Sequence, residues 1–281
     1  MHETDRKKQI FVSTACLEGE CSLAEILEIY GDRCIQNIEL GSSHHYVNDV
    51  EKLLSNYPDA NFIIHNYFPP PERPFIMNLA SQDERIRENS IDICKKAVDL
   101  CKMCGCDLYS FHPGFRVETT LNPGFDLSSA ELVPYEKALS SFYSSLEEIY
   151  DYARRNGVNL ALENLEHKNQ AYMMTQPEDF KELLDIYPDF GILLDLGHLK
   201  IASRRLGFKM NDFVEVVKEN VFGVHVHEND GNDDLHLEPM KSETVENYVA
   251  LLNCSKIIIE SRNMDIDSIE QNVEFLSRYI G

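Results

Sequence analysis

Residues 190–227 read FGILLDLGHLKIASRRLGFKMNDFVEVVKENVFGVHVH, and they contain the repeating unit of the chain. A short apolar run at 190–195 comes before a stretch at 211–220 whose apolar residues recur every three or four positions, and a second apolar run follows at 221–227. Short apolar runs are typical of buried strands, and the three-to-four spacing is typical of a helix with one apolar face. The stretch therefore predicts a strand, a helix and a second strand.

The same alternation extends along the whole chain. Apolar runs predict strands at 10–15, 37–40, 61–65, 107–112, 158–163, 190–195, 221–227 and 256–260. Helical spacing predicts helices at 22–30, 45–57, 81–104, 134–157, 176–187, 211–220, 242–253 and 267–280. Residues that favour helix starts stand at Ser22, Ser81, Pro177 and Ser242.

Repeated strand–helix units without a long linker predict an α/β fold, a single (β/α)8 TIM barrel. We expect one domain over residues 1–281, with 1–9 as a polar N-terminal tail. An open, doubly wound sheet is the alternative. Such a sheet usually carries a glycine-rich phosphate turn after its first strand, where this chain has TACLEGE.

Charge and the N-terminal sequence limit the partners and the compartment. The 281 residues carry a formal net charge of −22, which repels polyphosphate, so we expect no binding to duplex nucleic acid or anionic lipid. The start, MHETDRKKQ, is too polar for a signal peptide, and no apolar run reaches the roughly 18 residues of a spanning helix. We therefore expect a cytoplasmic protein without a membrane anchor.

The cysteines suggest reduced thiols and not a disulfide scaffold, because eight cysteines are few for a chain of this length. Cys101, Cys104 and Cys106 have spacing that could hold a metal, but no second cysteine pair follows at the distance of a zinc ribbon. Gly105 is typical of a helix end. We interpret this cluster as buried thiols at a helix terminus, with a metal or redox role as the alternative.

Ionisable residues stand at the ends of six consecutive predicted strands. In chain order these residues are His65, His112, Glu163, Asp195, the pair His225 and His227, and Glu260. One such residue alone is more often a solvated or hydrogen-bonded residue at the rim. The carboxyl ends of parallel barrel strands converge on one mouth, however, where enzymes of this fold place their chemistry.

Three carboxylates that converge in one mouth repel one another unless a cation neutralises them. The histidines between them favour zinc, with manganese or cobalt possible, over magnesium. Two loops add a second set of potential ligands, because His198 follows Asp195 by three residues and Asp234 precedes His236 by two. The long irregular stretch at 113–133 is also of a length that is usually functional.

Several motifs resemble those of a known superfamily. They are FHPG at 111–114, ALEN at 161–164, LLDLGH at 193–198, VHVHEND at 224–230, IIIE at 257–260 and IMNLASQDERIRENSI at 76–91. In combination they resemble the endonuclease IV-like branch of the xylose isomerase-like TIM-barrel superfamily.

This resemblance implies three zinc ions. The first would be held by His65, His112 and Glu163. The second would share Glu163 and add Asp195, His225 and Glu260, and the third would be held by His198, Asp234 and His236. His227 departs from the usual residue of the family, and we expect it to contact substrate or to support the ligands.

Other departures argue against an abasic DNA duplex as the substrate. The turn at 41–45 reads GSSHH and lacks the arginine with which endonuclease IV reaches into damaged DNA. The stretch HNYFPPPERPF at 65–75 replaces a tyrosine–leucine wedge, although Tyr67 remains available to stack on a base or a sugar.

The stretch HENDGNDDLHLEP at 227–239 resembles a different group of relatives, the sugar-phosphate isomerases and epimerases. In such epimerases one divalent ion sits on four ligands that match Glu163, Asp195, His225 and Glu260. The two glutamates would then move a proton next to a carbonyl group.

The residues taken together favour a metal-dependent phosphoester hydrolase with two to three ions, in which Glu163 and Glu260 are catalytic. The expected substrate is a small phosphorylated sugar or nucleotide, or a non-duplex nucleic acid, and the candidate substrate-binding residues are His227, Arg116, Lys168 and Tyr67. Further cations near strand ends are Arg73, Lys200, Arg204 and Arg262. A single-metal sugar or sugar-phosphate isomerase or epimerase is the alternative, and a non-catalytic metal-binding barrel is a third hypothesis.

Overall fold

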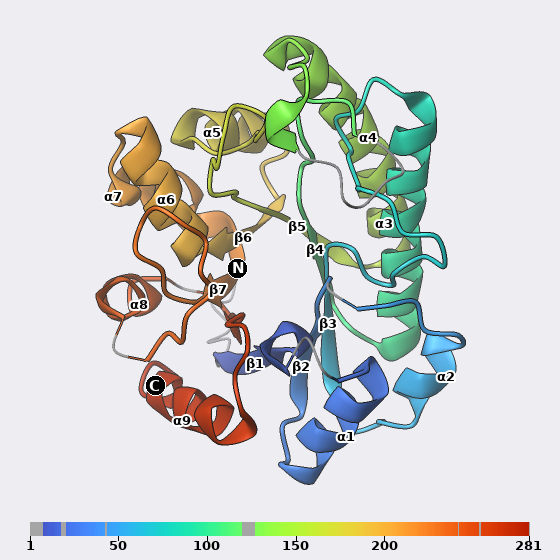
Figure 1. The fold of residues 1–281 in the computed structure, drawn as a ribbon, viewed down its shortest axis with the longest axis vertical. Helices are drawn as coiled ribbons and strands as arrows, with labels where there is room; N and C mark the ends of the chain where they lie inside the picture. The colour runs from blue at the N-terminus through green and yellow to red at the C-terminus, as the bar shows by residue number, and fades with distance from the viewer. Residues whose placement is uncertain are drawn as a thin grey trace.

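Eight parallel strands close into a barrel in which each strand pairs with the next in the sequence and β8 pairs with β1 (Figure 1). The structure is a computed structural model that describes residues 8–17, 21–42, 44–119, 127–240, 242–252 and 254–280. The strands are β1 (Gln9–Ser13), β2 (Asn37–Leu40), β3 (Asn61–His65), β4 (Leu108–Phe111), β5 (Asn159–Glu163), β6 (Gly191–Asp195), β7 (Val221–Val226) and β8 (Lys256–Ile259). The predicted (β/α)8 fold is confirmed.

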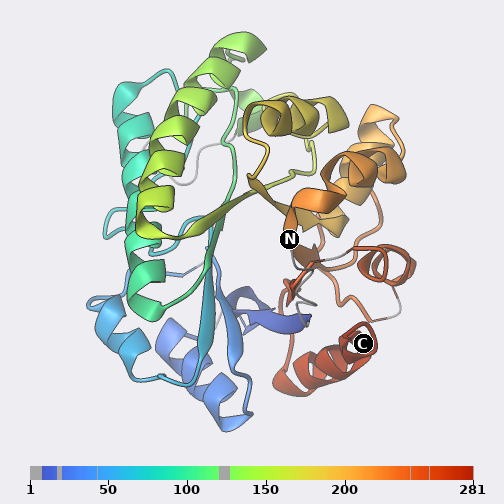
Figure 2. The same cartoon turned by 180° about the vertical axis from the view of Figure 1, so that it is seen from behind.

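Helices surround the barrel, and their colours follow the chain around the ring in Figure 1; Figure 2 shows the same ring from behind. They are α1 (Leu23–Asp32), α2 (Val50–Ser55), α3 (Glu84–Cys104), α4 (Tyr135–Asn156), α5 (Pro177–Ile186), α6 (Leu196–Leu206), α7 (Met210–Val217), α8 (Glu243–Val249) and α9 (Ile266–Ser277). Short 3-10 turns occur at η1 (Thr14–Leu17), η2 (Leu127–Ser129) and η3 (Lys218–Asn220).

The local signals at helix starts are confirmed at three of four positions. Ser22 and Ser242 accept hydrogen bonds from first-turn backbone N–H groups of α1 and α8, and Pro177 occupies the first turn of α5. The prediction at Ser81 is wrong, because the N-cap of α3 is Asp83, two residues later, and the helix begins at Glu84.

Other boundaries also differ from the prediction. Helix α2 is limited to six residues within the predicted span 45–57, and β1 begins at Gln9, which the sequence assigned to the tail. Helix α6 was not predicted at all. It follows β6 without a loop, because the carboxylate of Asp195 accepts a hydrogen bond from the backbone N–H of His198 at 2.6 Å and caps the new helix.

The barrel interior has an apolar layer below a polar layer. Side chains alternate between the two faces of a strand, so residues two apart point into the same space. The apolar layer consists of Phe11, Ile63, Leu108, Ala161, Leu193 and Ile258. Two residues further along the same strands come Ser13, His65, Ser110, Glu163, Asp195 and Glu260, all of them buried. The apolar layer thus supports the polar layer at the carboxyl-terminal mouth.

The cysteines of the 101–106 segment lie where the sequence predicted. Gly105 adopts a left-handed conformation at the end of α3, and Cys101 and Cys106 are buried there. Burial raises the pKa of Cys104 to about 12, so this thiol stays protonated at neutral pH.

Among the helices described, none combines the length and the apolar character that a lipid bilayer demands of a span.

Shortening a side chain of the apolar layer tests its supporting role. Leu193→Ala is expected to lower the free energy of unfolding by about 2–5 kcal/mol, because Leu193 is fully buried and its neighbours cannot fill the space it leaves. Leu251→Ala, at a side chain that is 71% exposed, is the matched control and should change it by less than about 0.5 kcal/mol. Urea denaturation of both variants measures the difference. Equal losses of unfolding free energy in the two variants would show that the apolar layer does not support the barrel.

Candidate metal centre

The polar layer and the loops above it assemble four groups of potential metal ligands within the described part of the chain, three of which share residues. The groups are His65–His112–Glu163, Glu163–Asp195–His225–Glu260, Glu39–His65–His225, and His198–His227–Asp234–His236. In each group, one ligand atom per residue lies within 4.8 Å of the others. The nine ligands implied by the family resemblance are all present in these groups, together with Glu39 and His227.

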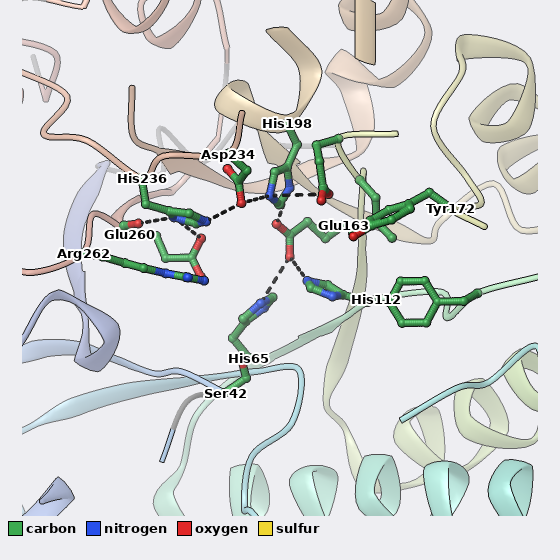
Figure 3. Close-up of a pocket in the computed structure, with 13 residues that line it drawn as sticks. Ser42, His65, His112, Glu163, Tyr172, His198, Asp234, His236, Glu260 and Arg262 are labelled. Atoms are coloured by element: carbon green, nitrogen blue, oxygen red, sulfur yellow. Dashed lines mark hydrogen bonds and ion pairs between the residues drawn. The ribbon is translucent and has the colours of Figure 1, made fainter. Parts of the chain in front are cut away.

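Glu163 lies at the centre of the assembly and presents one oxygen to each side (Figure 3). Its Oε2 atom is 3.2 Å from Nε2 of His65 and 2.9 Å from Nε2 of His112. Its Oε1 atom is 3.1 Å from Nδ1 of His198 and 3.5 Å from Nδ1 of His225. This arrangement is the one that a carboxylate bridging two ions requires.

The first group is His65, His112 and Glu163. His65 is the last residue of β3, and its Nδ1 atom is 3.0 Å from the hydroxyl oxygen of Ser110, which fixes the ring while Nε2 faces Glu163. His112 follows β4 directly and contacts the side chain of Asn66 through its own Nδ1 atom. Three protein ligands leave at least one further position on an ion held here.

The second group adds Asp195, His225 and Glu260 to Glu163. The Nδ1 atom of His225 is 3.2 Å from Oε2 of Glu260 and 3.6 Å from Oδ2 of Asp195. Asn164 holds the backbone of Asp195 from both sides, since its amide donates to the Asp195 carbonyl oxygen and accepts from the Asp195 N–H, each at 2.9 Å. The ALEN motif thus orients a ligand on the neighbouring strand.

Glu39 is a further buried residue of the site that was not predicted from the sequence. This glutamate is fully buried, and its Oε2 atom is 2.8 Å from Nε2 of His225, the ring nitrogen opposite the one that faces the second group. A carboxylate behind a ligating imidazole fixes its tautomer and increases its basicity. The sequence did contain a sign of this role, since Glu39 is an acidic residue inside an apolar run. It points inward although it is not the last residue of β2.

The third group comes from α6 and from the loop after β7. His236 and His198 each bond through Nδ1 to a backbone carbonyl oxygen, of Glu260 at 2.7 Å and of Asn164 at 3.0 Å. Their Nε2 atoms face Oδ2 of Asp234 at 2.8 Å and 3.5 Å. His227, predicted as a substrate-binding or supporting residue, lies within this group.

Electrostatics couples the carboxylates to the histidines. Burial by itself raises the pKa of Glu163, but His112, His65 and His225 outweigh it and hold that pKa well below its ordinary value. Burial lowers the pKa of His225, yet Glu39, Glu260 and Glu163 raise it well above the ordinary value. Without a cation, buried imidazolium groups must supply the positive charge. Binding of a cation would displace those protons.

Buried polar atoms without hydrogen-bond partners test whether the groups fit metal ions. Among the described residues such atoms include Oε1 of Glu163 and Nδ1 of His225 in the second group, and Nδ1 of His227 and Oδ1 of Asp234 in the third. Buried polar atoms in folded proteins are rarely left unsatisfied. Orphaned atoms of this kind, in a donor set of imidazoles and carboxylates, fit divalent ions such as zinc.

A cavity of about 160 Å³ opens onto the groups, with walls formed by Ser42, Phe115, Leu165, Glu166, Tyr172 and Arg262. Among the described residues that line it, Arg262 is the only arginine or lysine (Figure 3). An adjoining cavity of about 220 Å³ shares Ser42, His112 and Phe115, and its own walls include Asn66, Tyr67 and Phe75. The accessible space is small, partly aromatic and poor in cations.

The other predicted substrate contacts lie in different places. Tyr67 lines the adjoining cavity, where its hydroxyl accepts a hydrogen bond from the backbone N–H of Phe75. Arg116 stacks over Tyr135 and donates to the Val133 carbonyl oxygen, and it lines neither cavity. Lys168 is exposed and also lies outside both linings, so the substrate-binding roles of these two cations stay predictions.

Two further cations from the sequence analysis stabilise the loop after β7. Lys200 pairs with Glu228 and donates to the Asn229 carbonyl oxygen, and Arg204 donates to the Asp230 carbonyl oxygen.

The predicted functional stretch 113–133 is described only in part, because 120–126 lie outside the described residues.

Comparison with known proteins places the chain in a family. Residues 27–279 match the xylose isomerase-like TIM barrel family. An uncharacterized protein of Methanocaldococcus jannaschii is 26% identical over 276 residues, which covers 96% of this chain and 98% of that protein. A probable endonuclease 4 of Aquifex aeolicus is 23% identical over 214 residues, 68% of this chain and 71% of its own length.

Solved structures share the architecture at low identity. A D-tagatose 3-epimerase-like protein superposes with a TM-score of 0.70 at 21% identity, and the match covers 97% of each chain. A Thermus thermophilus protein soaked with zinc chloride has a TM-score of 0.63 at 16% identity, over 97% of this chain and 98% of that one. These similarities establish the fold. The chain belongs to the xylose isomerase-like TIM barrel family. A probable endonuclease 4 is among the proteins similar in sequence, and a D-tagatose 3-epimerase-like protein is among those similar in structure.

The role of Glu39 can be tested directly. Glu39→Gln keeps the shape of the side chain but removes the charge behind His225, so it is expected to weaken zinc binding by about 10–100-fold. Isothermal titration of chelator-treated protein with zinc measures the effect. Glu28→Gln, an exposed glutamate on α1, is the control and should bind zinc as the wild type does. Unchanged affinity in the Glu39 variant would contradict the proposed support of His225.

Proposed function

We propose that this xylose isomerase-like TIM barrel is a metal-dependent enzyme that hydrolyses a phosphoester at a centre of two or three zinc ions. One observation carries the proposal: the nine residues that the endonuclease IV resemblance implies as ligands lie together, in two groups that share Glu163 and a third group whose His198 contacts Glu163. A single-metal reaction has no use for His65, His112, His198, Asp234 and His236 as ligands.

When bound, zinc ions lower the pKa of a water ligand towards neutrality and stabilise the attacking and leaving oxygens of a phosphoester. The protein supplies the positions. Glu163 sets the spacing of the first two groups because each of its oxygens faces one of them. Ser110 fixes His65 and Asn164 fixes Asp195, so the ligands are held in place before substrate arrives.

The cavity supports a small substrate. Its walls provide Arg262 for an anionic group and aromatic faces at Phe115 and Tyr172 for an apolar or ring-shaped part. A DNA duplex would need many phosphate contacts, and the net charge of −22 disfavours them. We therefore propose a phosphorylated sugar or nucleotide, or a single strand, as the substrate class.

An isomerase or epimerase reaction is the second candidate. The observation that favours it is the second group, in which Glu163 and Glu260 both contact Nδ1 of His225 and could act as an acid–base pair around one ion. Structural neighbours include proteins titled as D-tagatose 3-epimerase-like and D-psicose 3-epimerase. This reaction needs one divalent ion and no water as nucleophile.

Metal stoichiometry separates the two candidates. Protein purified without chelator is expected to contain two to three zinc equivalents per chain by elemental analysis, and to hydrolyse members of a panel of phosphorylated sugars, nucleotides and a chromogenic phosphodiester. Prolonged treatment with a strong chelator should abolish turnover, and added zinc should restore it. One equivalent of metal together with interconversion of sugars, and no hydrolysis, would establish the epimerase instead.

The central carboxylate gives a second test. Glu163→Gln is expected to lower kcat by about 10²–10⁴-fold, because the bridge loses its charge and one of its two acceptor oxygens. Circular dichroism should remain that of the wild type. Glu274→Gln, at an exposed position of α9, is the control and should retain full turnover. Full activity in the Glu163 variant would contradict the bridging role.

DNA specificity provides a third test. Catalytic amounts of the enzyme are expected to leave an abasic duplex uncut within the time in which the best small phosphoester is consumed. The physical reason is the negative surface, so low ionic strength should not rescue cleavage as it would for a basic enzyme. Rapid incision of the abasic duplex would show that the altered segments at 41–45 and 65–75 do not exclude DNA.

A further inference from the structure

His227 adds a fourth potential ligand to a group for which the family resemblance implies three. It follows β7 directly, two residues after His225. Its ring stacks on that of His236, with centroids 4.0 Å apart and planes 18° from parallel, and meets the ring of His198 edge-on at 5.6 Å. Three imidazoles therefore surround the carboxylate of Asp234.

The hydrogen bonds of this group leave ligand atoms free. The Nδ1 atoms of His198 and His236 bond to backbone carbonyl oxygens, so Nε2 of each ring faces Asp234 and is the nitrogen that an ion would take in place of a proton. His227 is 1% exposed, and its Nδ1 atom has no hydrogen-bond partner among the described residues. The Oδ1 atom of Asp234 is orphaned in the same way.

The fold makes room for this fourth ring at one glycine. A Cβ atom at Gly197, in the first turn of α6, would lie 2.1 Å from Cε1 of His227 and 2.6 Å from each ring nitrogen. No real Cβ atom makes such contacts. The amide of Asn229 also donates to the Gly197 carbonyl oxygen at 3.0 Å, which ties the loop after β7 to this turn. Any residue larger than glycine at 197 must displace His227.

We propose that His198, His227, Asp234 and His236 form a closed, four-ligand zinc site with a structural role. Four protein ligands complete the tetrahedron that zinc prefers, so an ion held here has no position left for water or substrate. The first group has three protein ligands and remains open. The inference rests on the proposed multinuclear centre and divides it: the open position for chemistry belongs to the ion of His65, His112 and Glu163, and the outer ion anchors α6 to the loop after β7.

The same position would also allow His227 to support Asp195 without binding the outer ion. Its Nε2 atom is 3.1 Å from Oδ2 of Asp195 and 3.9 Å from Oδ1 of Asp234, so it lies between the second and third groups. If His227 only supported Asp195, its loss would loosen the inner ion by about 10–100-fold and leave the outer ion in place. The experiment must therefore identify which ion is lost.

The test compares variants loaded with zinc and then equilibrated against chelators of increasing strength. His227→Asn and His236→Asn are each expected to lose one zinc equivalent, with the affinity for that ion lowered by more than about 100-fold. The double variant should lose the same single equivalent, since both residues hold one ion. Gly197→Ala should weaken the same ion by displacing the ring, although every ligand remains in the sequence. Elemental analysis counts the ions, and thermal unfolding should show a lower Tm in each variant.

His167→Asn is the matched control. His167 is a half-buried histidine that belongs to none of the ligand groups, and its left-handed φ of 50° is one that asparagine also tolerates. This variant should keep all zinc equivalents and the wild-type Tm.

Other outcomes have distinct meanings. Loss of two equivalents in the double variant, or full retention of zinc in Gly197→Ala, would overturn the fourth-ligand assignment. Wild-type protein with only two equivalents would overturn the closed site and leave the proposed function standing. Three equivalents without hydrolysis of any phosphoester would do the reverse, because the site would remain and the proposed function would fail.

Discussion

The arrangement of the barrel mouth depends on one constraint, the burial of like charges. Glu39, Glu163, Asp195 and Glu260 are all buried within one layer, and every ion pair that they form among the described residues is with a histidine. Buried carboxylates that share a site cannot all stay ionised without compensating positive charge. Neutral imidazoles cannot provide that charge, so protons or metal ions must. The donor set selects ions of the zinc type.

The barrel brings these groups together through the alternation of side chains. On six of the strands an apolar residue in the lower layer is followed, two residues later, by a polar residue in the upper layer, as in Leu193 and Asp195. The lower layer supplies the hydrophobic stabilisation, so the upper layer can hold charges that destabilise an ordinary core. Ligands from outside the strands then join them: His198 lies in α6, whose start Asp195 caps, and Asp234 and His236 lie in the loop after β7.

The same alternation explains what the sequence could and could not predict. All eight strands were predictable from apolar runs, and the residues at their ends could be placed in one mouth because parallel strands converge there. Glu39 was missed because it is the penultimate residue of β2, and only its inward orientation, not its position at the strand end, identifies it. Helix α6 was missed because no loop separates it from β6. Arg116 satisfies its guanidinium with Tyr135 and a carbonyl oxygen, a tertiary contact that strand-end position does not reveal.

The number of open coordination positions determines the chemistry more than the number of ligands does. An ion whose positions are all taken by protein ligands has no place for water or substrate, whereas a catalytic ion keeps one position open. The first group, with three ligands beside the cavity, meets the requirement for catalysis, whereas the third group gains His227 as a fourth potential ligand. A barrel with a closed outer site and an open first group can use the outer ion to fix α6 and the loop after β7. That loop in turn positions Arg262, whose backbone N–H donates to the carbonyl oxygen of His236 at 2.9 Å. His236 thus links the outer metal group to Arg262 of the cavity, because its side chain belongs to the group and its carbonyl oxygen holds the arginine backbone.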